Sequence, residues 1–262
     1  MVRLFFLVLC IVMALPGFAG GSTIRVGAYT AKPGLLDPNL GRIQRELGIR
    51  LEISELGGVD MLRSLEAGRL DAIFVAGSME NLLETAQKHG YPTKFIFDYH
   101  YCQVGEDELS VLVNPDVLTD ASMLMAELDP GTIRGLFTGR IRNWREAGGP
   151  DMPVVVLRAR QMHTTNNLFQ KIAMQGEAFA ADARILDGSL NAFVETLSRT
   201  RGAIGIGPLP FVRSTKVWSP AQAPKIRRPF VLVVSDRATP GMRRSLARLV
   251  DFLRRLPPQV GR

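Results

Sequence analysis

The sequence predicts an α/β protein with a largely parallel sheet. Alternating or wholly apolar stretches typical of strands recur along the chain, and amphipathic stretches typical of helices lie between them. Hydrophobic residues make up 46% of the 262 residues and charged residues 22%, the composition of a globular protein rather than a disordered or fibrous one. Repeated strand–helix–strand order is the pattern of parallel sheets covered by helices.

Strands and helices alternate over the first third of the chain. Glycine directly after the last apolar residue of a helix is a common stop signal, and Gly48 and Gly68 both stand at such places. We predict strands at 23–29, 50–54 and 71–76, and helices at 39–47, at 61–67 and from Ser78 or Glu80 to 90.

The rest of the chain continues this pattern with longer connections. It contains no internal repeat, and its most linker-like stretch is the Ser-, Pro- and Ala-rich segment 214–224. Further strands are predicted at 95–99, 109–113, 153–157, 202–207 and 229–234, and helices at 123–127, 130–136, 165–174, 188–199 and 240–256.

The first 19 residues have the order of a secretory signal. Arg3 supplies a positive charge, residues 4–15 are apolar, and Gly17 and Ala19 are the small residues of a cleavage site. An apolar run of this length is shorter than the roughly 20 residues that cross a bilayer, which disfavours the alternative of an uncleaved anchor. We therefore expect a signal peptide at 1–19 and a soluble, periplasmic mature protein.

Cysteine and histidine are too few for a disulfide scaffold or a zinc site, since there are two Cys and three His. Removal of the signal removes Cys10, and Cys102 then lacks a partner and is interpreted as a small apolar side chain in a strand. No two His stand at metal-ligand spacing, and no Gly-x-Ser-x-Gly, Walker or dinucleotide-binding motif is present. We expect no catalytic residue, no metal and no cofactor.

Several segments, taken in order, resemble one family. The most specific is IRGLFTGRIRNW at 133–144, and the others are the glycine turn and helix at 57–72, LSVLVNP at 109–115, the pattern Arg158…Thr164…Phe169, and GAIG at 202–205. Together they resemble the phosphate-type substrate-binding proteins of ABC transporters, which have the type 2 periplasmic binding protein fold. The resemblance covers nearly all of the mature chain.

This resemblance implies two α/β lobes with a ligand cleft between them. Lobe one would comprise 23–107 plus 212–262, and lobe two 108–211. The chain would cross between the lobes near 106–108 and near 209–212. A hinged cleft that closes on its ligand is the motion expected of such a fold.

In lobe one, the resemblance places ligand contacts in three loops. Thr30 follows the first strand and would supply a hydroxyl, and Gly58, Val59 and Asp60 lie in the turn before a helix and would supply backbone N–H groups. Ser78 follows the third strand and is the candidate polar contact there. The alternative for Ser78 is a helix N-cap, a common role for serine.

In lobe two, Arg158 matches the arginine of the family and Thr164 its threonine, with Thr165 next to it as a further donor. The Ser-Gly pair that the family has before this threonine is replaced by Met162 and His163, which removes a hydroxyl and adds bulk. His163 is a candidate ligand contact or a polar residue at a helix start. Arg158 also fits a surface or hinge ion pair.

These residues predict an exported solute-binding protein for phosphate or a similar small oxyanion. Its partners would be that ligand and an ABC permease, and we expect a monomer. The alternative is a signalling or scaffold protein of the same fold with an altered or lost anion site, presented to a membrane sensor. An enzyme is disfavoured because no nucleophile, base and orienting group can be assigned.

The formal net charge of +7 comes from the end of the chain. Residues 213–262 hold 12 Lys or Arg against 2 Asp or Glu, and five of these basic residues lie in the last predicted helix. Its arginines would form a solvated face, while Leu246, Leu249, Val250 and Leu253 would pack inward. The positive charge therefore does not indicate a basic cleft, and we expect no nucleic-acid partner.

Overall fold

The protein is described by a computed structural model that covers residues 22–91, 99–118, 128–208, 217–235 and 237–257. The predicted signal peptide, the helix at 123–127, the crossing at 209–212 and most of the strand at 95–99 lie outside these residues. Among the described residues no helix has the length and apolar character needed to span a membrane.

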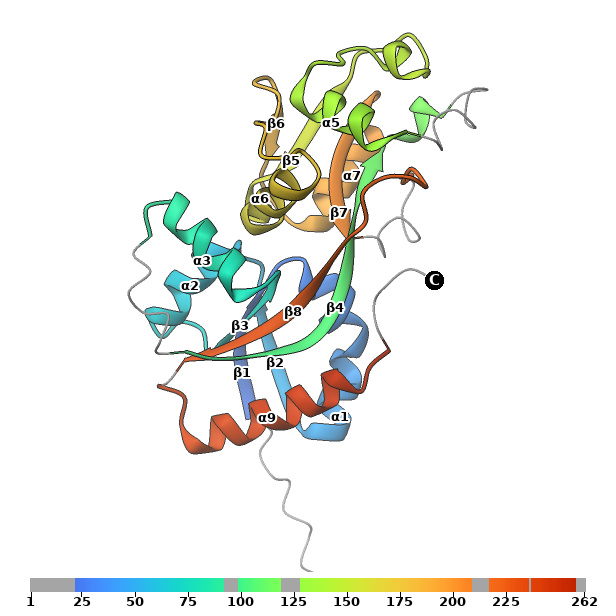
Figure 1. Ribbon diagram of the computed structural model, residues 1–262. Helices are drawn as coiled ribbons and strands as arrows, with labels where there is room; N and C mark the ends of the chain where they lie inside the picture. Colours follow the sequence, from blue (N-terminus) through green and yellow to red (C-terminus); the bar gives the residue numbers. More distant parts are fainter. Residues whose placement is uncertain (1–21, 92–98, 119–127, 209–216, 236, 258–262) are drawn as a thin grey trace, which may run out of the picture.

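The described strands form one sheet in the order β2-β1-β3-β8-β4-β7-β5-β6 (Figure 1). The strands are β1 Ser22–Ala28, β2 Ile49–Ser54, β3 Ala72–Ala76, β4 Tyr99–Val113, β5 Val155–Ala159, β6 Arg184–Leu186, β7 Ala203–Pro208 and β8 Ile226–Ser235. The α-helices are α1 Leu40–Leu47, α2 Gly58–Glu66, α3 Met79–Lys88, α5 Pro130–Thr138, α6 His163–Ile172, α7 Leu190–Arg199 and α9 Pro240–Arg254.

The sheet is parallel towards both ends and antiparallel in its middle. At one end β1 pairs in parallel with β2 and β3, and at the other β5 pairs in parallel with β6 and β7. Between them, β3–β8, β8–β4 and β4–β7 are antiparallel. The predicted α/β class is confirmed, and the two long strands β4 and β8 connect its two halves (Figure 1).

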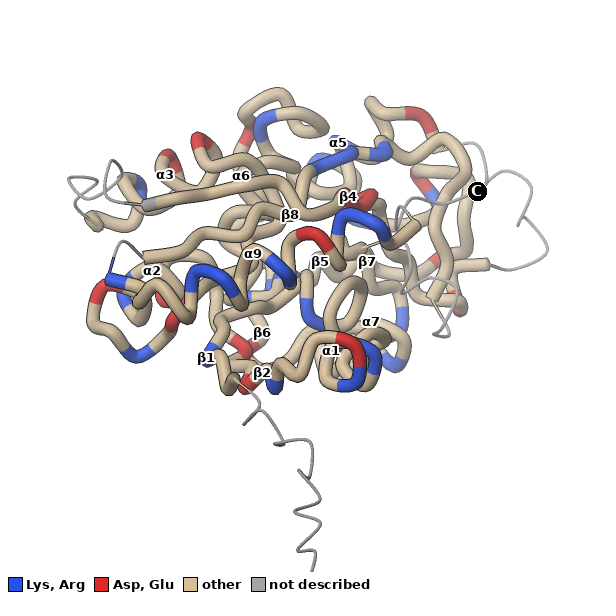
Figure 2. The backbone as a smooth tube through the Cα atoms, turned by 90° about the horizontal axis from the view of Figure 1, so that it is seen from below, with Lys and Arg blue, Asp and Glu red and all other residues tan. Residues whose placement is uncertain are grey.

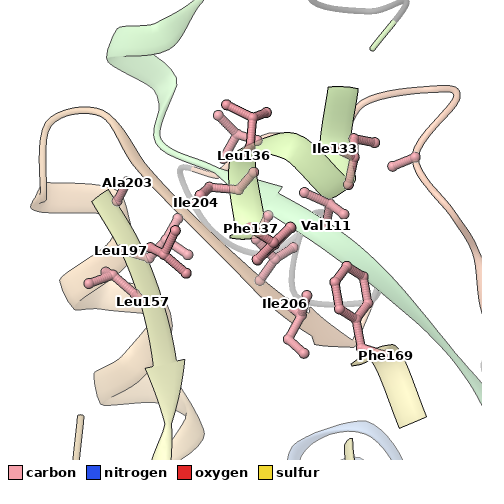
Figure 3. Packing of buried hydrophobic residues seen from close by; sticks show 14 of the residues in the cluster. Val111, Ile133, Leu136, Phe137, Leu157, Phe169, Leu197, Ala203, Ile204 and Ile206 are labelled. Carbon is pink, nitrogen blue, oxygen red and sulfur yellow. The ribbon is translucent and has the colours of Figure 1, made fainter. Parts of the chain in front are cut away.

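Each half of the sheet has its own apolar core. On one face of β1, β3 and β8, the helices α1 and α9 bury a cluster around Phe74 and Phe230, and α2 and α3 bury a second cluster around Ile73 and Val231 on the other face. Alternate strand residues thus serve opposite faces. In the other half, residues of β4, β7, α5, α6 and α7 form a third cluster, shown in Figure 3.

The last helix is amphipathic in the way that its sequence predicts. Leu246, Leu249, Val250 and Leu253 are buried, and the arginines of α9 at 243, 244, 248 and 254 are exposed. Figure 2 shows these basic positions along α9. These four arginines place part of the basic charge of the C-terminal segment on the outer side of the first half of the sheet.

Helices α2 and α6 begin earlier than predicted. Gly57 has extended backbone and α2 starts at Gly58, three residues before the predicted start. Likewise α6 starts at His163 rather than Thr165, directly after a short 3₁₀ turn at 160–162. Residues predicted to lie in loops therefore form first helical turns, whose N–H groups have no partner within the helix.

Strand β4 is longer than its local sequence indicates. It runs for 15 residues, whereas the predicted strands at 95–99 and 109–113 include only Tyr99 and the last five, and Cys102 alone between them is interpreted as a strand residue. The polar residues between Gln103 and Glu108 hide the strand pattern, and a register shift between Gln103 and Gly105 interrupts the alternation. Pairing with β8 along this stretch supplies the hydrogen bonds that make it a strand.

Two glycines with left-handed backbone give a matched stability test. Gly202 (φ +72°) is buried, and a Cβ there would lie 2.2 Å from the Pro153 carbonyl oxygen, whereas Gly68 (φ +69°) has open space. We expect Gly68→Ala to lower the free energy of unfolding by about 1 kcal/mol and Gly202→Ala by about 3 kcal/mol, since the second adds a collision to the backbone strain. Urea unfolding measures both, and equal losses would contradict the assigned packing.

Candidate functional site

A small cavity of about 20 Å³ lies where the two halves of the molecule meet. It is formed by the loop after β1, the end of β3, the start of α2 and the start of α6. Its lining residues are Tyr29, Thr30, Gly58, Met61, Phe74, Val75, Ala76, Gln161, Met162, Thr164 and Thr165. A cavity needs roughly 10–15 Å³ to hold one water, so this one has room for about one, and a tetrahedral anion requires the halves to move apart.

The first turns of α2 and α6 face each other across this cavity. A Cβ on Gly58 would lie 2.7 Å from Thr164 Oγ1, and one on Gly57 would lie 2.8 Å from the Gln161 carbonyl oxygen. At position 57 the obstacle is backbone, so glycine is required there for this approach, whereas at position 58 the neighbouring side chains would have to shift. The first N–H groups of a helix have no partner within it, and together with the positive end of the helix dipole they favour an anion at each of these termini.

Hydroxyl groups complete the polar part of the lining. Thr30, Thr164 and Thr165 are all buried, and Thr164 Oγ1 has no hydrogen-bond partner among the described residues. Thr165 Oγ1 accepts a hydrogen bond from Arg228 Nη1. A buried hydroxyl without a partner carries a desolvation cost of about 1–3 kcal/mol, which a bound acceptor would remove.

Four of the predicted contacts thus line one cavity: Thr30, Gly58, Thr164 and Thr165. Val59 lies in the first turn of α2, but its side chain packs into the apolar cluster beneath α2 and α3. Backbone N–H is then the only group that Val59 can offer to a ligand.

Three predicted contacts lie away from the cavity lining. Ser78 caps α3, with its hydroxyl accepting from the N–H of Asn81 at 3.2 Å. The Arg158 guanidinium lies over the Phe179 ring, 4.2 Å from its centroid, where burial lowers the pKa of the arginine. Ser78 therefore has the alternative role of an N-cap. Arg158 has neither of its predicted roles, since within the described part of the chain it contacts an aromatic ring rather than the cavity or an acidic partner.

His163 is the third, and it belongs to the contact between α6 and α3. Its ring centroid lies 4.2 Å from that of His89. Beside this pair, Asn167 Nδ2 donates to Thr85 Oγ1 at 3.1 Å, and Lys171 lies 3.5 Å from Glu84. These contacts hold the two halves closed on one side of the cavity.

Tyr29 closes another side. Its hydroxyl donates to the Gly188 carbonyl oxygen at 3.0 Å, so the loop after β1 is tied to the loop before α7. Burial, with a smaller effect of Glu55, raises the pKa of Tyr29, which therefore remains a donor at neutral pH.

Sequence reasoning missed two charged residues behind the cavity, Arg228 and Asp107. Arg228 precedes the apolar run of β8, and Asp107 lies among the polar residues of β4. No local pattern distinguishes them from solvent-facing strand residues. Only the register of β4 against β8, in which they are direct partners, brings them together.

Comparison with known proteins gives a family for most of the chain. Residues 20–237 match the model of the PBP superfamily domain. The phosphate-binding protein PstS of Bacillus subtilis is 28% identical over 131 residues, which cover 50% of this chain and 40% of the relative. The chain thus aligns with less than half of that relative.

Solved structures show the same fold. A phosphate ABC transporter substrate-binding protein from Clostridium perfringens, with bound phosphate, has a TM-score of 0.68 at 17% identity and covers 88% of this chain and 93% of its own. The OxyR regulatory domain of Pseudomonas aeruginosa has a TM-score of 0.55 at 16% identity, and the match covers 89% of this chain and 97% of that domain's chain. At these identities the likeness concerns the fold, which serves both transport and regulation.

The histidine pair predicts a pH dependence. Burial lowers the pKa of His163, and the charges of His89, Arg158 and Arg160 lower it further, while Asp60 opposes them. The unfolded chain, with a histidine pKa of about 6.5, therefore binds more protons than the folded one at mildly acidic pH, and stability is complete above about pH 6.5 and falls below it. Thermal unfolding of the wild type and of His163→Gln at about pH 8 and about pH 5 tests this. We expect the loss on acidification to be smaller in His163→Gln; equal losses would contradict the assignment.

Proposed function

This chain belongs to the PBP superfamily, and on that premise we propose that it is an exported solute-binding protein that binds phosphate or a similar small oxyanion for an ABC transporter. The observation that carries the proposal is the cavity between facing first turns of α2 and α6, with the hydroxyls of Thr30, Thr164 and Thr165 on its wall. Backbone N–H groups at helix starts, together with hydroxyls, are the donors that a tetrahedral oxyanion needs.

Two lobes that open and close explain how a cavity for one water admits such an ion. The lobes of the proposal are 23–107 plus 212–262 and 108–211. The separate apolar clusters and the crossing of β4 and β8 between the two halves support this division, except that Val217, Ala223 and Ile226, which it assigns to lobe one, pack in the cluster of the second half. Thr30 and Gly58 then belong to one lobe and Thr164 and Thr165 to the other, so only a closed cleft presents all the donors together.

The finer features of the proposal follow from the family. A signal peptide at 1–19 would deliver the protein to the periplasm, where a permease would receive the ligand from a monomeric binding protein. The protein would carry out no chemistry and bind no nucleic acid. Ligand would favour the closed state because its contacts come from both lobes at once.

The second candidate is a regulatory protein of the same fold that has lost or altered its anion site and contacts a membrane sensor. Met162 favours it, because this buried apolar side chain lines the cavity where the resemblance implies a serine. The stacking of Arg158 on Phe179 also favours it, since this guanidinium is then not directed at a ligand.

Calorimetric titration of the mature protein with phosphate, sulfate and molybdate separates the two candidates. A transport protein binds at least one of these oxyanions, with heat that saturates at one ion per chain. A folded protein that binds none of the three overturns the oxyanion proposal and leaves the regulatory candidate.

Gly58→Ala tests the location of the site. Its new methyl group would lie 2.7 Å from Thr164 Oγ1 and 2.9 Å from Leu82 Cδ1, so the Thr164 side chain, which lines the cavity, would have to shift when the cleft closes over an ion. A cost of roughly 1–3 kcal/mol for this overpacking corresponds to a loss of affinity of about 5- to 150-fold. The matched control is Gly34→Ala, whose methyl group meets nothing within 4 Å. Titration with the bound oxyanion measures both, and unchanged affinity in Gly58→Ala would move the ligand away from this cavity.

A further inference from the structure

An ion pair is fully buried where the two connecting strands pair. Asp107 of β4 and Arg228 of β8 are 1% and 2% exposed and stand directly opposite each other in the register. Arg228 Nε donates to Asp107 Oδ1 at 2.5 Å, and Nη2 donates to Oδ2 at 2.8 Å. This bidentate geometry fixes the plane of the guanidinium as well as its position.

The remaining arm of the guanidinium reaches the cavity wall. Arg228 Nη1 donates to Thr165 Oγ1, and Thr165 lines the cavity in the first turn of α6. One arginine therefore joins β4, β8 and α6. The connection passes from the strands between the two halves to a residue that would touch the ligand.

This contact determines what the Thr165 hydroxyl offers. A guanidinium has only donors, so Thr165 Oγ1 is the acceptor, and its single hydrogen remains available to another group. No other hydrogen bond of this hydroxyl occurs within the described ranges, and the cavity adjoins it. Thr164, by contrast, has a hydroxyl oxygen without any partner among those residues, so no hydrogen bond fixes its orientation.

We propose that Arg228, held by Asp107, is a positioning residue that fixes the Thr165 hydroxyl as a donor towards the bound oxyanion and holds the first turn of α6 against β4 and β8. This inference rests on the proposed function and adds the residue that prepares the site before ligand arrives. Arg228 does not itself touch the ion. Its charge is balanced by Asp107, so it acts through the orientation of Thr165.

The experiment compares variants that disturb this connection with a matched control. Thr165→Val removes the hydroxyl and keeps the ion pair, and Thr165→Ser restores a hydroxyl. Arg228→Gln combined with Asp107→Asn removes both charges together, which avoids a buried unpaired charge. Thr164→Val is the control, because Thr164 lines the same cavity without touching Arg228.

Phosphate affinity, measured by titration calorimetry, gives the first readout. We expect Thr165→Val and the neutralised pair each to weaken binding about tenfold, the value of one lost hydrogen bond. Because both changes act on the same hydroxyl, combining them should weaken binding by little more than either change alone. The losses of affinity caused by Thr164→Val and by the neutralised pair should instead multiply when the two are combined. Thr165→Ser should restore most of the affinity. Multiplying losses for Thr165→Val and the neutralised pair, or wild-type affinity in that pair, would overturn the proposal.

Amide hydrogen exchange of the ligand-free protein gives a readout that does not depend on binding. The neutralised pair and Thr165→Val should both speed exchange at the start of α6, over 163–168, while Thr164→Val should not. Unchanged exchange in the first two variants would overturn the role of Arg228 even if phosphate binds. If the wild type binds no oxyanion but the exchange pattern holds, the proposed function fails while the link to α6 stands.

Discussion

The antiparallel pairing of β4 with β8 is the constraint on which the two halves of this molecule depend. The register places Asp107 opposite Arg228, both buried, and loss of one partner of such a pair costs about 3–5 kcal/mol. A slip of one residue would also turn every side chain of β8 to the opposite face of the sheet. The pair therefore opposes alternative registers and, with them, alternative positions of one half relative to the other.

The site follows from where the sheet ends. Parallel strands such as β1 and β3 place their carboxyl ends at one edge, and the loops and helices that follow them meet there. Thr30 and Gly58 come to this edge from one half, and Thr164 comes from the first turn of α6 in the other. No single element could supply these donors, because a helix start offers only its first few N–H groups.

Much of the fold was predictable, and the site only in part. Apolar patterning predicts β1 and α9 because each buries one regular face, and it predicts β3 because this short run is apolar and buried throughout. The turn before α2 and the threonine of α6 are recognisable as short motifs. Arg158 and Ser78 were placed by analogy of position, but an arginine beside Phe179 can stack on the ring, and a serine before a helix can cap it. Arg228 lay beyond prediction, since its partner is 121 residues away and only strand register joins them.

The contact of α3 with α6 stabilises the closed arrangement of the two halves, so its strength affects how readily a ligand enters. Glu84 and Thr85 of α3, with His89 directly after it, contact three residues of α6 beside a cavity that has space for about one water, namely Lys171, Asn167 and His163. Ligand can enter only the fraction of molecules that is open, and the apparent dissociation constant rises in inverse proportion to that fraction. An open population of about 1% would weaken apparent affinity about a hundredfold with every donor in place. The strength of a surface beside the cavity thus sets, together with the donors, the concentration range over which the protein responds.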